Sequence, residues 1–169
     1  DVRVESALAA GLNLGRTTLD TLSADLSDKT RNAAEELARL PNASAVLAME
    51  RMRAQLGASD MVLWSGSGQP LATAGASRFD FAPNRPPLAV LRTVRANRVL
   101  AQVEGLEESA DTAEASGLEV NQARIKVLAL VSTPGFGLDV EPRYLQVVVP
   151  LPQALVIDAL AVQVANREY

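Results

Sequence analysis

One long helix at the start of the chain limits what the rest of it can form. Between Val4 and Leu40 apolar residues recur at every third or fourth position, at Leu8, Leu12, Leu19, Leu22, Leu26, Ala33, Leu37 and Leu40. This spacing predicts an amphipathic helix of roughly 55 Å at 1.5 Å per residue. Charged residues such as Arg16, Asp28, Arg31 and Glu35 lie away from the apolar stripe. A helix of this length exceeds what a small domain needs to cover its own core.

The region after this helix changes from helical to strand-like patterns. Pro41 ends the first helix, and a second is expected from an N-cap at Asn42 or Ser44 to a stop at Gly57. A hairpin is predicted with strands at 61–65 and 71–74, followed by a helix at 88–98 and a short strand, VLAQVEG. The segments RIKVLALVS and RYLQVVVPL predict two central strands, because they are rich in Val and Leu without clean alternation. Pro152 begins a last helical pattern that runs to Tyr169.

This order of elements predicts an α+β fold with a central antiparallel sheet of about five strands flanked by helices. A hairpin, a helix and a three-strand meander follow one another as in PAS-like sensor folds. We therefore expect one domain over 1–169, with a long helix at 1–40, a PAS-like core at 42–152 and a C-terminal helix at 153–169. Because neither terminal helix has a cap, we expect the domain to be inserted between two segments that continue.

The composition excludes several kinds of chemistry. The 169 residues include no Cys and no His, so disulfides, Ser-His-Asp or Cys-His catalysis and His or Cys metal sites are impossible. The two lysines, Lys29 and Lys126, lie in no motif for Schiff-base chemistry. A net charge of −4 gives no basic surface for nucleic acid, and no run of eighteen apolar residues occurs. We expect no catalytic residue, no metal and no cofactor.

Two flanking segments resemble a known family. The opening DVRVESALAAGLNLGRTTLD and the closing ALAVQVANREY resemble the flanks of the extracytoplasmic region of NtrY-type membrane-bound sensor histidine kinases, nitrogen-regulation proteins of bacteria. The resemblance is strongest over 1–20 and 155–169. It implies a periplasmic sensor module of PDC or Cache type in an inner-membrane protein, with transmembrane segments next to both flanks and the kinase parts C-terminal to Tyr169. The absence of His agrees with it, because the phosphoacceptor would lie elsewhere.

A ligand pocket can be placed from the fold that this resemblance implies. In PAS-like sensor folds the ligand lies between the central sheet and the helix and loops after the hairpin. Residues of this region that suit a small anion are Trp64, Arg92, Arg95, Arg124, Arg143 and Tyr144, because the planar guanidinium group fits a carboxylate. The alternative is that the two aromatic residues belong to the core and the arginines to the surface.

Two further clusters have both a functional and a structural interpretation. Ala7, Gly11 and Gly15 place a small residue at every fourth position, which predicts close packing of two first helices in a homodimer. Alternatively, the helix merely tolerates them, at about 1 kcal/mol per glycine. The acidic residues Glu104, Glu107, Glu108, Asp111 and Glu114 could bind a hard cation, or they could form a solvated loop, which we favour because no calcium-loop pattern occurs.

The sequence therefore predicts a non-catalytic periplasmic sensor domain of a two-component histidine kinase, which passes a stimulus through its terminal helices to a cytoplasmic kinase and its response regulator. The alternative is the ligand-binding sensor domain of a chemoreceptor or a cyclase. A small stand-alone enzyme is a third possibility, and the missing His and Cys count against it.

Overall fold

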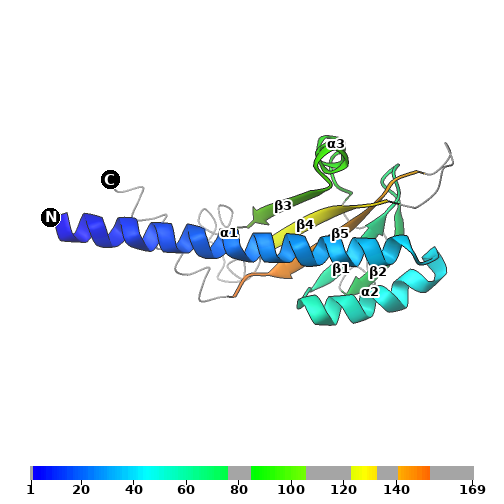
Figure 1. The fold of residues 1–169 in the computed structure, drawn as a ribbon, viewed down its shortest axis with the longest axis horizontal. Helices are drawn as coiled ribbons and strands as arrows, with labels where there is room; N and C mark the ends of the chain where they lie inside the picture. The colour runs from blue at the N-terminus through cyan, green and yellow to red at the C-terminus, as the bar shows by residue number, and fades with distance from the viewer. Residues whose placement is uncertain (1, 76–84, 106–122, 133–140, 153–169) are drawn as a thin grey trace, which may run out of the picture. The chain divides into compact units, whose positions relative to one another are not determined.

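The fold combines three helices with a five-stranded sheet in the part of the chain that the structure describes. The computed structural model describes residues 2–75, 85–105, 123–132 and 141–152, with side chains of the first helix from Gly15 onward. The elements are α1 (Val2–Ala38), α2 (Asn42–Leu56), β1 (Asp60–Trp64), β2 (Pro70–Gly75), α3 (Leu88–Asn97), β3 (Val99–Glu104), β4 (Arg124–Val131) and β5 (Arg143–Pro150) (Figure 1). The antiparallel sheet has the order β2-β1-β5-β4-β3. The predicted α+β class is confirmed, and the predicted helix at 153–169 lies outside the described residues.

The chain divides into two compact units. One unit comprises Asp1–Ala24, Val103–Ile125 and Pro150–Tyr169, and the other comprises Asp25–Gln102 and Lys126–Val149. The second unit holds α2, α3, β1 and β2 completely, and it contains the groove described below. The expectation of a single domain over 1–169 stays a prediction.

Helix α1 confirms the predicted long helix, shifted by two residues at each end. Its buried side chains follow the helical repeat at Leu26, Thr30, Ala33, Ala34 and Leu37. Positions 15–24 are all half-buried or exposed, so within the described side chains of α1 the apolar stripe is buried from Leu26 onward. Among the described residues, no helix is both long and apolar enough to cross a lipid bilayer.

The two ends of α2 differ from each other in how they are capped. Pro41 occupies the N-cap position and no side chain caps this end, so the prediction that Asn42 or Ser44 caps it is wrong. Asn42 Oδ1 instead accepts a hydrogen bond from Arg143 Nη1 at 2.7 Å. The predicted stop is confirmed, because Gly57 is left-handed at φ 66° and the N–H of Ala58 donates to the carbonyl of Arg53 at 3.0 Å.

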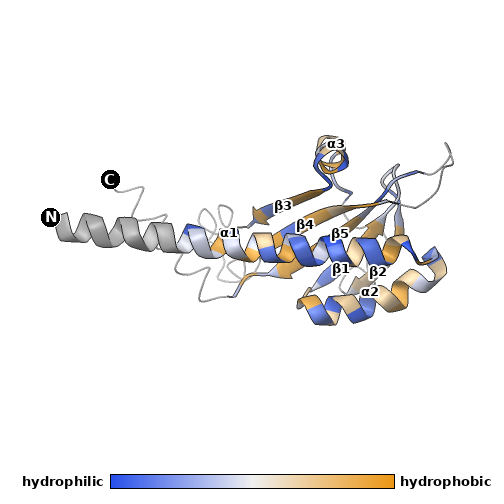
Figure 2. Cartoon of the chain, in the orientation of Figure 1, coloured by the Kyte–Doolittle hydropathy of each residue, from blue (hydrophilic) through white to orange (hydrophobic). Residues whose placement is uncertain are grey.

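The sheet confirms the predicted hairpin and the predicted central strands. β1 pairs with β2 from Asp60↔Gly75 onward, and on its other side with β5, where Trp64 lies opposite Tyr144. All five residues from Tyr144 to Val148 are buried, as expected of a strand covered on both faces. Figure 2 shows the same contrast, with apolar colours along β4 and β5 and mixed colours on α1 and α2.

Each face of the sheet has its own helical cover. Side chains alternate along a strand, so Val62 and Trp64 point to one face and Met61 and Leu63 to the other. The first pair packs with Leu91 and Val94 of α3, and with Leu128 and Tyr144, in one core cluster. Met61 and Leu63 are fully buried on the opposite face, and α2 contacts both β1 and β2. The sheet thus separates two groups of buried apolar side chains.

Leu37 tests how much the end of α1 contributes to this packing. Leu37→Ala is expected to lower the free energy of unfolding by about 3 kcal/mol, because its side chain is 0% exposed and its removal leaves a cavity. Denaturant unfolding followed by circular dichroism measures the change. Leu47→Ala on α2 is the matched control, since Leu47 is 81% exposed, and it is expected to change stability by less than about 0.5 kcal/mol. Equal losses in both variants would contradict the packing described here.

Candidate functional site

Two of the predicted ligand-binding residues, Trp64 and Tyr144, lie side by side in the core. They are paired across β1 and β5, and they are 1% and 3% exposed. Both contribute to the cluster under α3, together with Leu91 and Val94. The structure therefore brings these aromatic side chains together, and apolar neighbours fill the space around them. Their role in ligand binding stays a prediction.

A buried hydrogen bond fixes the indole of Trp64. Its Nε1–H donates to Gln146 Oε1 at 3.1 Å, and Gln146 is only 6% exposed. Gln146 is two residues from Tyr144, so its side chain leaves β5 on the same face. The pair satisfies polar atoms that would otherwise be costly to bury.

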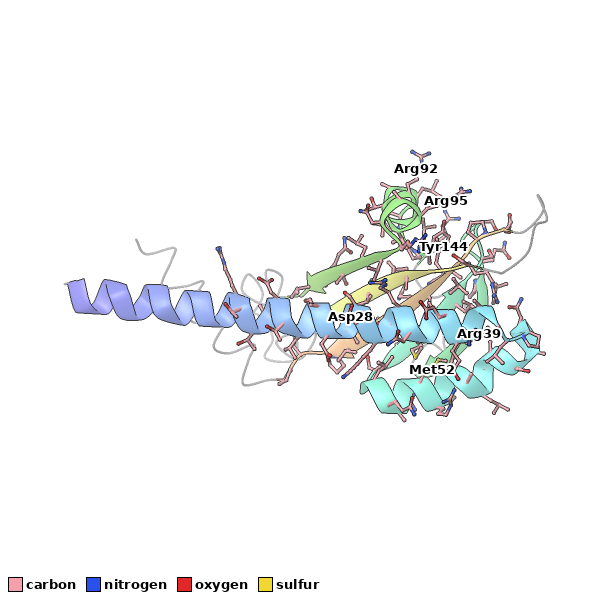
Figure 3. The ribbon with its side chains drawn as sticks, viewed as in Figure 1. Asp28, Arg39, Met52, Arg92, Arg95 and Tyr144 are labelled. Carbon is pink, nitrogen blue, oxygen red and sulfur yellow. The ribbon has the colours of Figure 1, made fainter. Side chains whose placement is uncertain are left out.

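The predicted arginines are distributed over separate places. Arg92 and Arg95 are exposed on α3, and Figure 3 shows Arg92 on its side away from the strands. Arg143 is half-buried at the start of β5, where it holds Asn42, and this burial lowers the pKa of its guanidinium below the usual value. In the other unit, Arg124 pairs with Glu104 at 3.1 Å.

The remaining predicted clusters fall largely outside the described residues. This applies to the side chains of Ala7 and Gly11, and to Glu107, Glu108, Asp111 and Glu114. A Cβ atom at Gly15 would meet nothing within 4 Å, so within this one chain there is room beside that glycine, and its role in dimer packing stays a prediction. In the described ranges, no group of three or more acidic residues is placed to hold a metal ion.

The structure adds a groove that the sequence did not indicate. The groove has a volume of about 290 Å³ and lies between the last turns of α1 and the corner where α3 passes into β3. One wall consists of Arg31, Ala34, Glu35 and Ala38 of α1 and of Arg39, which directly follows this helix, and the opposite wall consists of Arg98, Leu130 and Ser132. Arg31, Glu35 and Arg39 recur at every fourth position, which places Arg31 and Glu35 on one face of α1, and Arg39 directly follows the end of this helix. That repeat, with alanines beside it, is the only sequence signal that could have indicated the groove.

Arg98 has an unusual backbone conformation for its residue type. It follows α3 at φ 72°, and no other residue except glycine has a positive φ in the described part of the chain. The corresponding position after α2 is Gly57, at φ 66°. A left-handed residue with a Cβ costs roughly 1–2 kcal/mol, so Arg98 is strained where glycine would not be. Its N–H donates to the Val94 carbonyl at 2.7 Å and its carbonyl accepts from Leu130 N–H at 2.8 Å, which hold it in place.

The groove carries an excess of positive charge. Three arginines and one glutamate line it. Arg31 approaches Asp28 at 3.9 Å with both side chains more than half exposed, and such a pair contributes little. Within the described ranges, neither Arg39 nor Arg98 takes part in an ion pair. Two of the three guanidinium groups in the groove are therefore not neutralised by a carboxylate of the described residues.

The chain matches no known family model and no curated protein. Solved structures do resemble it. With a TM-score of 0.58 and 14% identity, it is similar to an extracellular ligand binding receptor from Desulfohalobium retbaense DSM5692, over 91% of this chain and 27% of that one. With a TM-score of 0.54 and 15% identity, it is similar to the sensory domain of the Campylobacter jejuni chemoreceptor Tlp3 (CcmL), solved with isoleucine bound, over 87% of this chain and 60% of that one.

These likenesses concern the fold. They confirm the predicted Cache or PAS-like type, an α+β domain with a five-stranded antiparallel sheet as in chemoreceptor sensor domains. The chain spans about a quarter of the first protein and about three fifths of the second.

The buried pair of Trp64 and Gln146 gives a prediction for stability. Gln146→Leu leaves the indole N–H without its acceptor and is expected to lower the free energy of unfolding by about 1–3 kcal/mol. Adding Trp64→Phe removes this unpaired N–H donor. The double variant is therefore expected to lose less free energy of unfolding than the sum of the losses in the two single variants. Denaturant unfolding of the four proteins measures this coupling. Additive losses would show that the hydrogen bond contributes nothing specific.

The strain at Arg98 gives a prediction of the opposite sign. Arg98→Gly is expected to raise the free energy of unfolding by about 0.5–1 kcal/mol, because relief of the left-handed strain exceeds the extra backbone entropy that glycine loses on folding. Asn97→Gly is the matched control within the last turn of α3, and it is expected to destabilise by about 0.5 kcal/mol. Thermal unfolding of both variants measures the two shifts, and a destabilised Arg98→Gly would contradict the strain.

Proposed function

We propose that this chain is a periplasmic ligand-binding sensor domain of a bacterial inner-membrane receptor. The observation that carries the proposal is the combination of a Cache or PAS-like sheet with one helix of 37 residues. Helix α1 begins 24 residues before Leu26, the first of its buried side chains in the described part, and that distance is roughly 36 Å along the axis. The residues of α1 up to Ala24 belong to one compact unit of the chain, and those from Asp25 onward belong to the other.

The long helix gives the domain a means of signalling. A ligand shifts a receptor between two states only by its differential affinity for them. Helix α1 shares one continuous backbone between the packed residues Leu26–Leu37 and the N-terminal part of the helix. A small displacement of the packed end would therefore move or rotate the other end. We propose that α1 also forms a homodimer contact around Ala7, Gly11 and Gly15.

We further propose which kind of signalling protein contains this domain. The resemblance of 1–20 and 155–169 supports an NtrY-type sensor histidine kinase of nitrogen regulation, acting on a cytoplasmic response regulator. The likeness to a chemoreceptor sensory domain supports a chemoreceptor equally well. In either case we propose no catalytic role for this domain, whose chain contains neither His nor Cys. Because the chemoreceptor domain was solved with isoleucine, small amino acids are the first candidate stimuli.

A chimera tests the signalling role of α1. Residues 1–169 are placed between the two transmembrane segments of a histidine kinase with a transcriptional reporter, and one to four alanines are inserted after Ala24. Each inserted residue rotates the helix by about 100°, so reporter output is expected to vary with insertion length and to return near its starting value after about four residues. The same insertions after Ser67, in the exposed hairpin turn, are the control. Constant output across the α1 series would contradict the proposal.

A further inference from the structure

We propose that the groove between α1 and Arg98 binds a small dianion, namely a short-chain dicarboxylate. The proposal goes beyond the sensor function, because it names a site and a ligand class that hold whether or not the domain signals. It rests on the charge of the lining, the placement of its arginines and the size of the groove.

The net positive charge of the groove lining favours an anion with two negative charges. Its lining carries three guanidinium groups and the single carboxylate of Glu35. Arg39 and Arg98 have no ion pair within the described residues, and Arg31 has only its long contact to Asp28. A planar guanidinium can donate two parallel hydrogen bonds to one carboxylate. Two carboxylates on one molecule would neutralise the excess of positive charge.

The arginines are spaced for a ligand with two separate ends. Arg31 lies on α1 and Arg39 directly follows its last residue, Ala38, so the two arginines are separated by the last two turns of the helix, and Figure 3 shows Arg39 near the C-terminal end of this helix. Arg98 stands on the opposite wall. Their long side chains can converge on a molecule between them, and a single small anion such as phosphate would reach fewer of them.

The lining and volume of the groove limit the rest of the ligand. Ala34, Ala38 and Leu130 provide apolar surface between the charged groups, which suits a short carbon chain. A volume of about 290 Å³ is just below the range for drug-sized ligand sites, roughly 300–1,000 Å³, so only a small molecule fits. A four- or five-carbon dicarboxylate fits these limits.

The conformation of Arg98 supports a binding role independently of charge. Its backbone is strained, although glycine serves the same position after α2. Hydrogen bonds to Val94 and Leu130 fix the Cα from which its side chain enters the groove. Such pre-organisation reduces the entropy that a ligand must remove on binding. A residue that lowers stability while lining a groove is typical of a functional position.

Titration calorimetry of the 169-residue chain with succinate tests the proposal. At an ionic strength of about 0.15 M, saturable binding is expected with a Kd below about 1 mM. Succinamide, which has the same carbon chain without charge, is expected not to bind. Inorganic phosphate and sulfate are expected to bind at least about tenfold more weakly than succinate. Equal affinity for phosphate and succinate, or the absence of saturable succinate binding, would overturn the proposal.

Variants locate the site. Arg98→Gly and Arg39→Gln are each expected to raise the Kd at least about tenfold, and Glu35→Gln is expected to lower it, because it removes a negative charge from the groove. Arg85→Gln is the matched control and is expected to leave the Kd unchanged, because Arg85 is exposed and does not line the groove. Since Arg98→Gly should fold at least as well as the parent, lost binding in it cannot be ascribed to unfolding. Unchanged affinity in both groove arginine variants would overturn the proposal, while the chimera result would still stand.

Discussion

The burial of β5 on both faces is the constraint on which the rest of the structure depends. A strand whose residues from Tyr144 to Val148 are all buried needs neighbours at both edges and a cover on each face. β1 and β4 provide the edges. On one face α3 contributes Leu91 and Val94, and on the opposite face α2 contacts β1 and β2. A 169-residue chain without disulfides can satisfy these requirements only with a core on each side of the sheet.

Local sequence patterns predicted the described helices and strands correctly. The features that they did not predict depend on contacts between residues distant in sequence. The strands were found within one or two residues because runs of Val and Leu ended at turn residues, and Gly57 ended α2 as expected. The N-cap of α2 was wrong because Asn42 bonds to Arg143, which lies 101 residues further along the chain. A sequence pattern cannot indicate a partner that only the folded sheet brings near.

The candidate site depends even more on contacts that a sequence pattern does not indicate. Trp64 and Tyr144 were selected as rare aromatic residues, and their strands were predicted, but their pairing depends on the register between β1 and β5. The groove combines a helix face around Glu35 with Arg98, and Arg98 adopts its conformation because α3 ends there while Leu130 bonds to its carbonyl. Charge spacing on α1 was visible in the sequence. The opposite wall was not, since it arises only when β3 and β4 pair.

The position of the groove connects the two proposals. One wall is the packed end of α1, and the other is the corner at Arg98, which is fixed to the sheet through β4. A dicarboxylate held by Arg39 and Arg98 together would favour whichever state brings these walls close, and it would have no effect on signalling if both states held them equally far apart. Binding to the groove is therefore a separate property from signalling. Signalling through it requires, in addition, that α1 change its distance from this corner between the two states.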